Sequence, residues 1–245
     1  MSQKFKIGDE VFVPATIVKL SNNGFALYKT TIVATDKKSI KVNLPGGNVS
    51  EFIGSSLAHC NTGIMIVTIG DNKTEDTLLV PLRKSVLQFS RLLFKDDYIL
   101  SVFCRSLKEF KLLWDKYNCS YSYLVIIGHG DKGGFEFGVD GHVSASDFLG
   151  VIEASSCSAK HIISLCCNTG YKTTGAVFSN SKKCLSCIAP FQSIHGAEAS
   201  QFLQTFLINH LLNGQSTKVA YKNSNALFAS KNTFRLWTNG KLTTK

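Results

Sequence analysis

The sequence predicts a layered α/β domain with a mainly parallel sheet, preceded by a small all-β domain. Apolar runs without polar alternation, at residues 123–127 and 161–166, are typical of strands buried on both faces of a parallel sheet. From residue 63 onward, segments with helical spacing alternate with such runs. Before residue 63, short strand-like segments follow one another at close spacing, punctuated by turns.

Five short strands are expected in the first 62 residues, at 11–13, 17–20, 25–28, 31–33 and 40–44. Turns rich in Gly, Asn and Asp separate them, which indicates a small barrel of the SH3 type. We assign 1–62 to this domain, with a docking or regulatory role. A structural cap on the larger domain is an equal alternative.

Residues 63–245 are predicted to form the α/β domain. Strands are expected at 64–69, 98–103, 123–127, 134–137, 161–166, 184–189 and 234–237. Helices are expected at 75–94, from Ser106 through Trp114, from Ser144 or Ser146 onward, and at 173–178, 197–212 and 216–228. Ser106 with Glu109 three residues later matches a capping box, and Pro81 is tolerated because it falls in a first turn.

The composition is that of a folded protein. The 245 residues can bury a core, and 44% hydrophobic against 18% charged residues excludes a disordered chain. No run approaches the roughly 20 apolar residues that span a bilayer, and residues 1–6 lead into no signal-peptide core. We therefore expect a soluble, cytoplasmic protein that does not contact a membrane.

The net charge of +10 raises nucleic acid as a partner. The basic residues are 23 lysines and 4 arginines, without a run of three, whereas base readout and phosphate clamping usually rely on arginine. We interpret the charge as a solvated lysine surface and do not expect direct nucleic-acid binding. Weak attraction to acidic partners stays open.

The eight cysteines are interpreted as reduced thiols, because no secretion signal accompanies them. Cys184 and Cys187 have the spacing of a redox or metal site. There is no second such pair, and both lie in an apolar run, so a structural strand is preferred. We expect no metal and no cofactor.

Two of the apolar runs end in a reactive side chain. Gly128-His129-Gly130 follows the first, and the second leads into Cys166-Cys167-Asn168-Thr169-Gly170. Ligands of parallel sheets sit beyond the carboxyl ends of the strands. If the two strands are parallel neighbours, His129 and Cys167 lie side by side there. A thiol beside an imidazole can form the thiolate–imidazolium pair of cysteine peptidases.

These two motifs, in this order, resemble the caspase-type fold of caspases, metacaspases, separase-like peptidases and, closest of all, bacterial CHAT-domain proteases. The resemblance covers nearly all of residues 63–230. It implies a three-layer α/β/α sandwich and acyl transfer, with Cys167 as the nucleophile and His129 as the general acid/base. It also implies that the backbones of Gly130 and Cys167 form the oxyanion hole.

Other cysteine, aspartate and histidine residues are alternative candidates for the active site. Cys166 is the rival nucleophile, although strand alternation would place it on the opposite face from Cys167. Asp131 follows the histidine motif, but family members often orient the histidine with a backbone carbonyl, so it receives no role. His195 is a weaker candidate for lining the site. His210 falls on the apolar stripe of a helix and is interpreted as core, and His142 has no such context.

Substrate preference is inferred from a departure from the family. Relatives that cut after arginine or lysine carry an aspartate two residues before the cysteine, where this chain has Leu165; cleavage after basic residues is therefore not favoured. Caspases bind aspartate with buried arginines, and no arginine of this sequence stands next to the motifs or to the loop around Phe191, so strict aspartate specificity is not expected either. A small or apolar P1 residue is what remains. Leu165 and Phe191 are the candidate substrate-binding residues.

The sequence thus predicts a cysteine endopeptidase that cleaves a protein substrate. The resemblance implies a regulated bacterial effector, in defence or cell death, that is switched on by an activating or sensor protein. The alternative is a catalytically silent scaffold that binds a partner protein through the N-terminal barrel. The intact pair of His129 and Cys167 argues against the scaffold, because a scaffold needs neither side chain.

Overall fold

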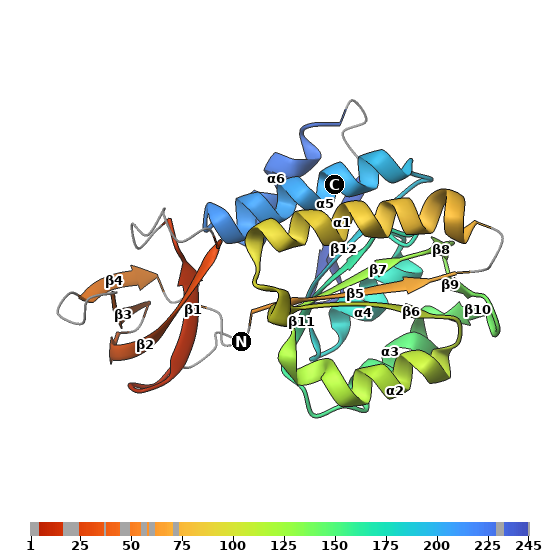
Figure 1. The fold of residues 1–245 in the computed structure, drawn as a ribbon. Helices are drawn as coiled ribbons and strands as arrows, with labels where there is room; N and C mark the ends of the chain where they lie inside the picture. The colour runs from red at the N-terminus through yellow and green to blue at the C-terminus, as the bar shows by residue number, and fades with distance from the viewer. Residues whose placement is uncertain are drawn as a thin grey trace.

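The computed structural model describes residues 5–16, 25–36, 38–44, 50–54, 58, 62–70, 74–228 and 233–244. They form a four-stranded sheet and a larger α/β unit built on a seven-stranded sheet (Figure 1). Over these ranges, no helix is both long enough and apolar enough to cross a membrane.

The four-stranded sheet is an antiparallel meander of β1 (Glu10–Pro14), β2 (Leu27–Thr35), β3 (Ser39–Asn43) and β4 (Ser50–Gly54). Alternating apolar residues give it a core of its own, made of Val11, Val13, Ile32, Ile40, Val42, Ile53 and Ala58. The strands expected at 25–28 and 31–33 are one strand, and β4 was not expected. The segment expected at 17–20 lies outside the described residues. SH3-type closure is not among the strand pairings that are described.

The larger sheet has the order β14-β13-β12-β11-β7-β5-β6. Its strands are β5 (Ile64–Ile69), β6 (Ile99–Cys104), β7 (Tyr123–Ile127), β11 (Lys160–Ser164), β12 (Cys184–Pro190), β13 (Phe234–Thr238) and β14 (Lys241–Thr244). The first five are parallel to one another, β13 pairs antiparallel with β12, and β14 pairs antiparallel with β13. Every residue of β5 and β7 is buried, because helices cover both faces of the central strands.

The helices form two layers, one on each face of this sheet (Figure 1). One layer holds α1 (Val80–Leu93), α5 (Gly196–Leu207) and α6 (Thr217–Asn225), and the other holds α2 (Leu107–Tyr117), α3 (Ala145–Glu153) and α4 (Val177–Asn180). A separate apolar core lies under each layer. The predicted α/β/α sandwich is confirmed.

Helix starts follow the expected capping chemistry. Ser106 and Ser144 each accept a hydrogen bond of 3.1 Å from a backbone N–H three residues later, so Ser144 rather than Ser146 caps α3. The segments expected as single helices at 75–94 and 197–212 each contain a turn of π-helix, Glu75–Leu79 before α1 and Ile208–Leu212 after α5.

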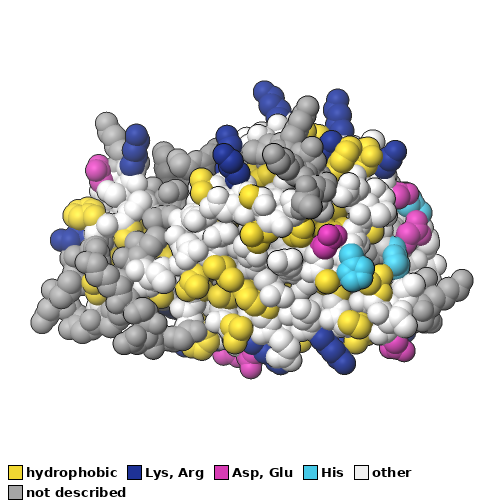
Figure 2. Space-filling view, turned by 90° about the horizontal axis from the view of Figure 1, so that it is seen from above, with side chains coloured by type: hydrophobic (Ala, Val, Ile, Leu, Met, Phe, Trp, Pro, Cys, Tyr) yellow, Lys and Arg dark blue, Asp and Glu magenta, His cyan; other side chains and the backbone are white. Residues whose placement is uncertain are grey.

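A small hairpin sheet of β8 (His129–Gly130), β9 (Gly134–Phe137) and β10 (Gly141–Ser144) follows β7. The seven cysteines that are described are free thiols, and Cys60 lies outside the described residues. Cys184 and Cys187 are buried in β12, which confirms the structural reading of their spacing. On the face shown in Figure 2, lysine and arginine side chains are dispersed and form no continuous stripe.

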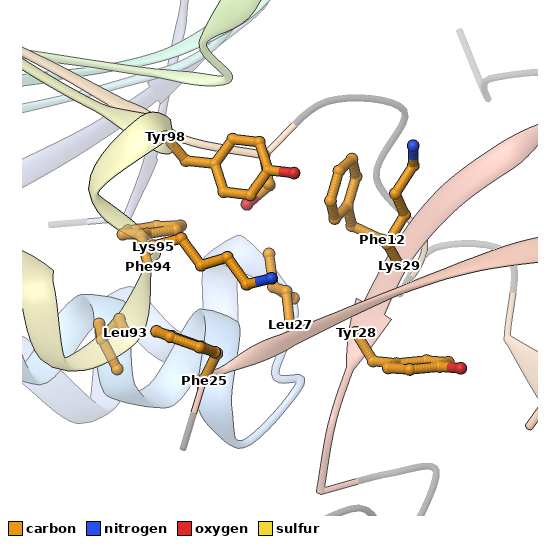
Figure 3. A pocket seen from close by; sticks show the side chains of 10 residues that line it. Phe12, Phe25, Leu27, Tyr28, Lys29, Leu93, Phe94, Lys95 and Tyr98 are labelled. Carbon is orange, nitrogen blue, oxygen red and sulfur yellow. The ribbon is translucent and has the colours of Figure 1, made fainter. Parts of the chain in front are cut away.

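The four-stranded sheet meets the larger unit at the end of α1. The Ala26 N–H donates to the Leu93 carbonyl at 3.0 Å, and the Phe12 and Tyr98 rings meet edge to face with centroids 5.7 Å apart. A cavity of about 380 Å³ lies at this junction. It is lined mainly by aromatic rings, and Lys95 extends its ammonium group toward its middle (Figure 3).

Candidate active site

The structure brings the two sequence motifs to one edge of the large sheet. Strands β7 and β11 are parallel neighbours, with Ile126 opposite Ser164. The Leu165 N–H continues this pairing by donating to the Ile126 carbonyl at 2.8 Å. His129 and Cys167 each stand three residues beyond the paired positions. Both therefore follow the carboxyl ends of adjacent strands, as the sequence predicted.

Cys167 lies half-buried in the turn that follows β11. The Ile194 N–H points at its Sγ, with a separation of 3.5 Å. The next residue, Asn168, has a φ of 60°, a left-handed conformation that asparagine tolerates better than most residues. The Asn168 N–H donates to the Gln192 carbonyl at 3.3 Å. The loop after β12 thus supports the turn that carries the thiol.

The neighbouring Cys166 has a different environment. It is fully buried, and its Sγ lies 3.7 Å from the Ile126 carbonyl oxygen. Burial raises the pKa of the Cys166 thiol to about 12, so it stays protonated at neutral pH. Of the pair, only Cys167 offers a thiol that a substrate could reach.

Thr74 contacts the imidazole of His129, which sequence reasoning did not anticipate. Its Oγ1 lies 2.6 Å from His129 Nε2. Thr74 sits just before the π-helical turn that leads into α1, 55 residues away from the histidine. No motif marks it, and the one available signal is a polar residue shortly after the buried strand β5. Because Nε2 of His129 contacts Thr74, Nδ1 is the ring nitrogen that stays available for proton transfer.

Asp131, which received no role from the sequence, is engaged in its own turn. Its Oδ1 accepts from the N–H groups of Gly133 at 2.6 Å and Gly134 at 2.9 Å, and it lies 3.2 Å from His142 Nε2. Desolvation alone would raise the pKa of Asp131, but these hydrogen bonds and His142 hold it below its usual value. The carboxylate therefore stabilises the hairpin that follows His129.

Gly130 packs directly on the turn that carries the cysteines. A Cβ on this residue would lie 2.8 Å from Thr169 Cγ2 and 2.9 Å from Cys166 Cβ, closer than real contacts allow. Glycine therefore lets the two loops approach each other. The N–H of Cys167 donates to no residue in the described ranges, which leaves it available as a donor.

The two candidate substrate-binding residues occupy different surroundings. Leu165 is only 3% exposed and belongs to the core under α1 and α5. Phe191 is half-buried in the loop after β12 and stacks on Tyr171, with ring centroids 4.3 Å apart. Their contact with a substrate stays a prediction.

The expectation that no arginine stands near this loop was wrong. In the antiparallel pair of β12 and β13, Arg235 lies opposite Ala189. Its Cζ lies 3.0 Å from the centroid of the Phe191 ring. This pairing joins segments that are distant in the sequence, so adjacency along the chain could not reveal it. The absence of a nearby arginine therefore no longer speaks against binding of an acidic substrate side chain.

His142, His195 and His210, the other histidines considered from the sequence, have different surroundings. His210 is buried, and its Nδ1 lies 2.7 Å from the Gln215 carbonyl oxygen, which confirms the core interpretation. His195 is exposed at the start of α5, where its Nδ1 accepts from the Ala197 N–H at 3.2 Å. It borders a second cavity of about 290 Å³, between α1 and α5. Exposed His142 serves the turn of Asp131.

Comparison with known proteins gives a fold relative but no sequence relative. No family model matches this chain, and no curated protein matches it. Among solved structures, a secreted C11 cysteine protease from Bacteroides thetaiotaomicron, "iotapain", matches with a TM-score of 0.54 and 8% sequence identity. The match covers 73% of this chain and 67% of that one. The fold is therefore the caspase-like α/β fold, as predicted; particular closeness to CHAT-domain proteases is not shown.

Proposed function

We propose that this protein is a cysteine endopeptidase with Cys167 as the nucleophile and His129 as the general acid/base. One observation carries the proposal: the two residues follow the carboxyl ends of adjacent parallel strands, and Cys167 is half-buried while Cys166 is sealed in the core. A parallel sheet directs such ends to one edge, where catalytic residues gather. The fold shared with a cysteine protease adds support.

The chemistry is acyl transfer. The Cys167 thiolate attacks the peptide carbonyl carbon, and the charge that develops on the oxygen is met by the N–H groups of Gly130 and Cys167. The C–N bond then breaks as the His129 imidazolium protonates the leaving amine, and water hydrolyses the thioester. Thr74 orients the ring by holding Nε2, so that Nδ1 carries the transferred proton.

Leu165 and Phe191 are proposed to border the bound substrate on either side of the Cys167 turn. The apolar surroundings of Leu165 offer no counter-charge to a basic P1 side chain, so arginine and lysine are disfavoured there. A small or apolar P1 residue fits this position best.

The organisation of the whole chain belongs to the same proposal. Residues 1–62 form an SH3-type docking or regulatory domain, and 63–245 form a peptidase domain closest to CHAT-domain proteases. The separate core of the four-stranded sheet supports this division. We place the enzyme in the cytoplasm as a bacterial effector in defence or cell death, switched on by a sensor protein.

Covalent labelling tests the proposal. Wild type and His129→Ala are treated with iodoacetamide and with a peptide chloromethyl ketone, and the modified cysteines are located by mass spectrometry. Cys119, which is also accessible, serves as the internal reference for an ordinary thiol. Cys167 should react faster than Cys119 at neutral pH, and this advantage should disappear without His129. Equal rates in both proteins would favour the catalytically silent scaffold.

A further inference from the structure

We infer that Lys132, Tyr171, Phe191 and Arg235 form a subsite that binds an acidic segment of the substrate beside the scissile bond. We call these four side chains the cation–aromatic cluster. The inference rests on the proposed peptidase function and assigns that site a substrate class. It concerns a subsite separate from the one bordered by Leu165.

The cluster is a stack of two cations and two rings. The Tyr171 and Phe191 rings are nearly parallel, at 27°, with centroids 4.3 Å apart. Lys132 Nζ lies 4.8 Å from the Tyr171 centroid. Arg235 Cζ lies 3.0 Å from the Phe191 centroid and 5.9 Å from that of Tyr171. The aromatic pair therefore fixes two positive charges along one short surface.

Three members of the cluster lie on the loops that carry the catalytic pair, and the fourth, Arg235, lies in β13 beside Phe191. Lys132 lies three residues after His129, and its carbonyl accepts hydrogen bonds from the hydroxyls of Thr173 and Thr174, which ties this loop to the segment after Cys167. Tyr171 directly follows the Cys167 turn. Phe191 belongs to the loop whose Ile194 N–H contacts the Cys167 sulfur. A substrate on the catalytic pair would therefore pass close to the cluster.

Neither positive charge is neutralised within the described part of the chain. The ion pairs found there do not include Lys132 or Arg235. Arg235 Nε is buried without a hydrogen-bond partner, and desolvation lowers the pKa of the guanidinium. A partly desolvated cation gains more from a carboxylate than a fully hydrated one does. The cluster is thus suited to an acidic side chain.

Strand alternation separates this subsite from Leu165. In β13, Phe234 and Leu236 point into the core under α1 and α5, which also contains Leu165. Trp237 points into the core under α2 and α3, and Arg235 shares its side of the strand. The cluster and Leu165 therefore lie toward opposite faces of the sheet, and the predicted P1 preference does not decide what the cluster binds.

Binding to a catalytically inactive protein tests the inference independently of peptide cleavage. The Cys167→Ala protein is titrated, at low salt, with a fluorescein-labelled peptide that alternates glutamate and glycine, and with its glutamine counterpart. The substitutions Lys132→Ala and Arg235→Leu are added singly and together, and Arg235→Lys tests charge rescue. Lys218→Ala, which removes an exposed charge from α6 on the other face, is the matched control.

The glutamate peptide should bind roughly three- to tenfold more tightly than the glutamine peptide. Each single substitution should reduce this preference, the double one should abolish it, and Lys218→Ala should leave it unchanged. Equal affinities, no binding of either peptide, or an effect of Lys218→Ala equal to that of Lys132→Ala would overturn the inference. So would tighter binding of an oligothymidylate with the same mutational sensitivity. If Cys167 is not labelled but the preference for the glutamate peptide is retained, only the peptidase proposal would be contradicted.

Discussion

Two cysteines that are adjacent in the sequence have opposite properties in the fold. Cys166 is sealed beneath the strand ends, whereas Cys167 stands in the turn beyond them. Cys167→Ala should therefore abolish peptide cleavage. Cys166→Ala should keep most of it and lower the stability of the fold by about 1 kcal/mol, because it removes a small buried group.

The measurement pairs turnover of a peptide pool with urea unfolding of the same two variants. Loss of activity in Cys166→Ala, with an unchanged unfolding midpoint and full activity in Cys167→Ala, would reverse the assignment of the nucleophile.

In the proposed mechanism Thr74 is a positioning residue, because it acts on the substrate only through His129. Thr74→Val removes the hydrogen bond to His129 Nε2, which contributes about 1 kcal/mol. If this energy is lost from the transition state, kcat should fall roughly fivefold. Thr74→Ser keeps the hydroxyl and should restore the rate.

Separate measurement of kcat and KM distinguishes this role from a general structural one. The kcat should fall in Thr74→Val and return in Thr74→Ser, with KM little changed. An unchanged kcat together with a raised KM would remove Thr74 from the proposed catalytic apparatus.

At the residue scale, the sequence indicated residues that are marked by their own segment and missed residues that contact the candidate site from distant segments. The positions of His129 and Cys167 beyond adjacent strand ends could be predicted because each follows its own apolar run. Thr74 and Arg235 could not, because they reach the site through contacts between distant segments. Neither lies in a motif, so composition and spacing carry no signal for them.

Among the elements, the short strand β8 links the histidine to the cysteine turn through Gly130. In Gly130→Ala, the new Cβ would also lie 3.1 Å from the Gly134 carbonyl oxygen, so the loop must shift. A displacement near 1 Å at a catalytic group can cost about a hundredfold in rate. We expect a loss of at least tenfold in cleavage, with near-native circular dichroism.

Gly133→Ala provides the matched control within the same hairpin. The nearest atom to its added Cβ, Asp131 Oδ1, is 3.5 Å away, an ordinary contact. This variant should keep wild-type cleavage. Similar losses in both variants would show that the hairpin tolerates no extra methyl group and that close packing of Gly130 on the turn has no special role.

The π-helical turn after α5 carries a pH-sensitive buried group. Burial lowers the pKa of His210 in the folded state below the ordinary value of 6.5. The unfolded chain therefore binds more protons below pH 6.5. The stability contributed by neutral His210 is complete above pH 6.5 and is lost as the pH falls from there through the lower pKa of the folded state.

Urea unfolding at pH 7.5 and 5.5 checks this expectation. His210→Asn can keep a donor to the Gln215 carbonyl but does not titrate, so its unfolding midpoint should fall less at pH 5.5 than that of wild type. The buried His161, whose ring centroid lies 5.2 Å away, is retained in both proteins. An identical pH dependence in both proteins would exclude His210 as its source.

The elements themselves were predictable to different degrees. Strands β5, β7 and β9 have the predicted bounds, because apolar residues and neighbouring glycines mark them in the sequence. The π-helical turns were missed, since their side-chain spacing is close to that of an α-helix. Strand β4 was missed because its pairing with β3, rather than its own composition, defines it.

At the scale of the whole molecule, the four-stranded sheet is part of the packing of the larger unit. Ala26, just before β2, belongs to the same core as Leu93 and Phe94, and the Thr16 hydroxyl donates to the Leu212 carbonyl. The predicted domain boundary at residue 62 matches the change in strand pattern, but it separates residues that belong to this one core. The sequence indicates the change in pattern but carries no signal for the contacts between the two sides of the boundary.

A fragment of residues 63–245 should therefore be less stable than the full chain. Removing residues 1–62 uncovers Leu93 and Phe94, which are 5% and 2% exposed in the full chain. Re-exposing two such side chains costs roughly 3 kcal/mol, which corresponds to a fall in Tm of about 6–12 °C for a chain of this size. Thermal unfolding by circular dichroism measures the difference.

Two full-length variants separate the junction from the rest of the four-stranded sheet. Ala26→Asp places a charge where Ala26 is buried against the larger unit and should approach the Tm of the fragment. Phe52→Ala alters a side chain that is 58% exposed on β4 and should leave the Tm unchanged. If the fragment melts at the temperature of the full chain while Ala26→Asp melts lower, the larger unit is self-sufficient and the sheet is only attached to it. If the Tm values of the fragment and of Ala26→Asp fall together, the junction stabilises the larger unit, and a partner that binds the sheet could act on the candidate active site through α1.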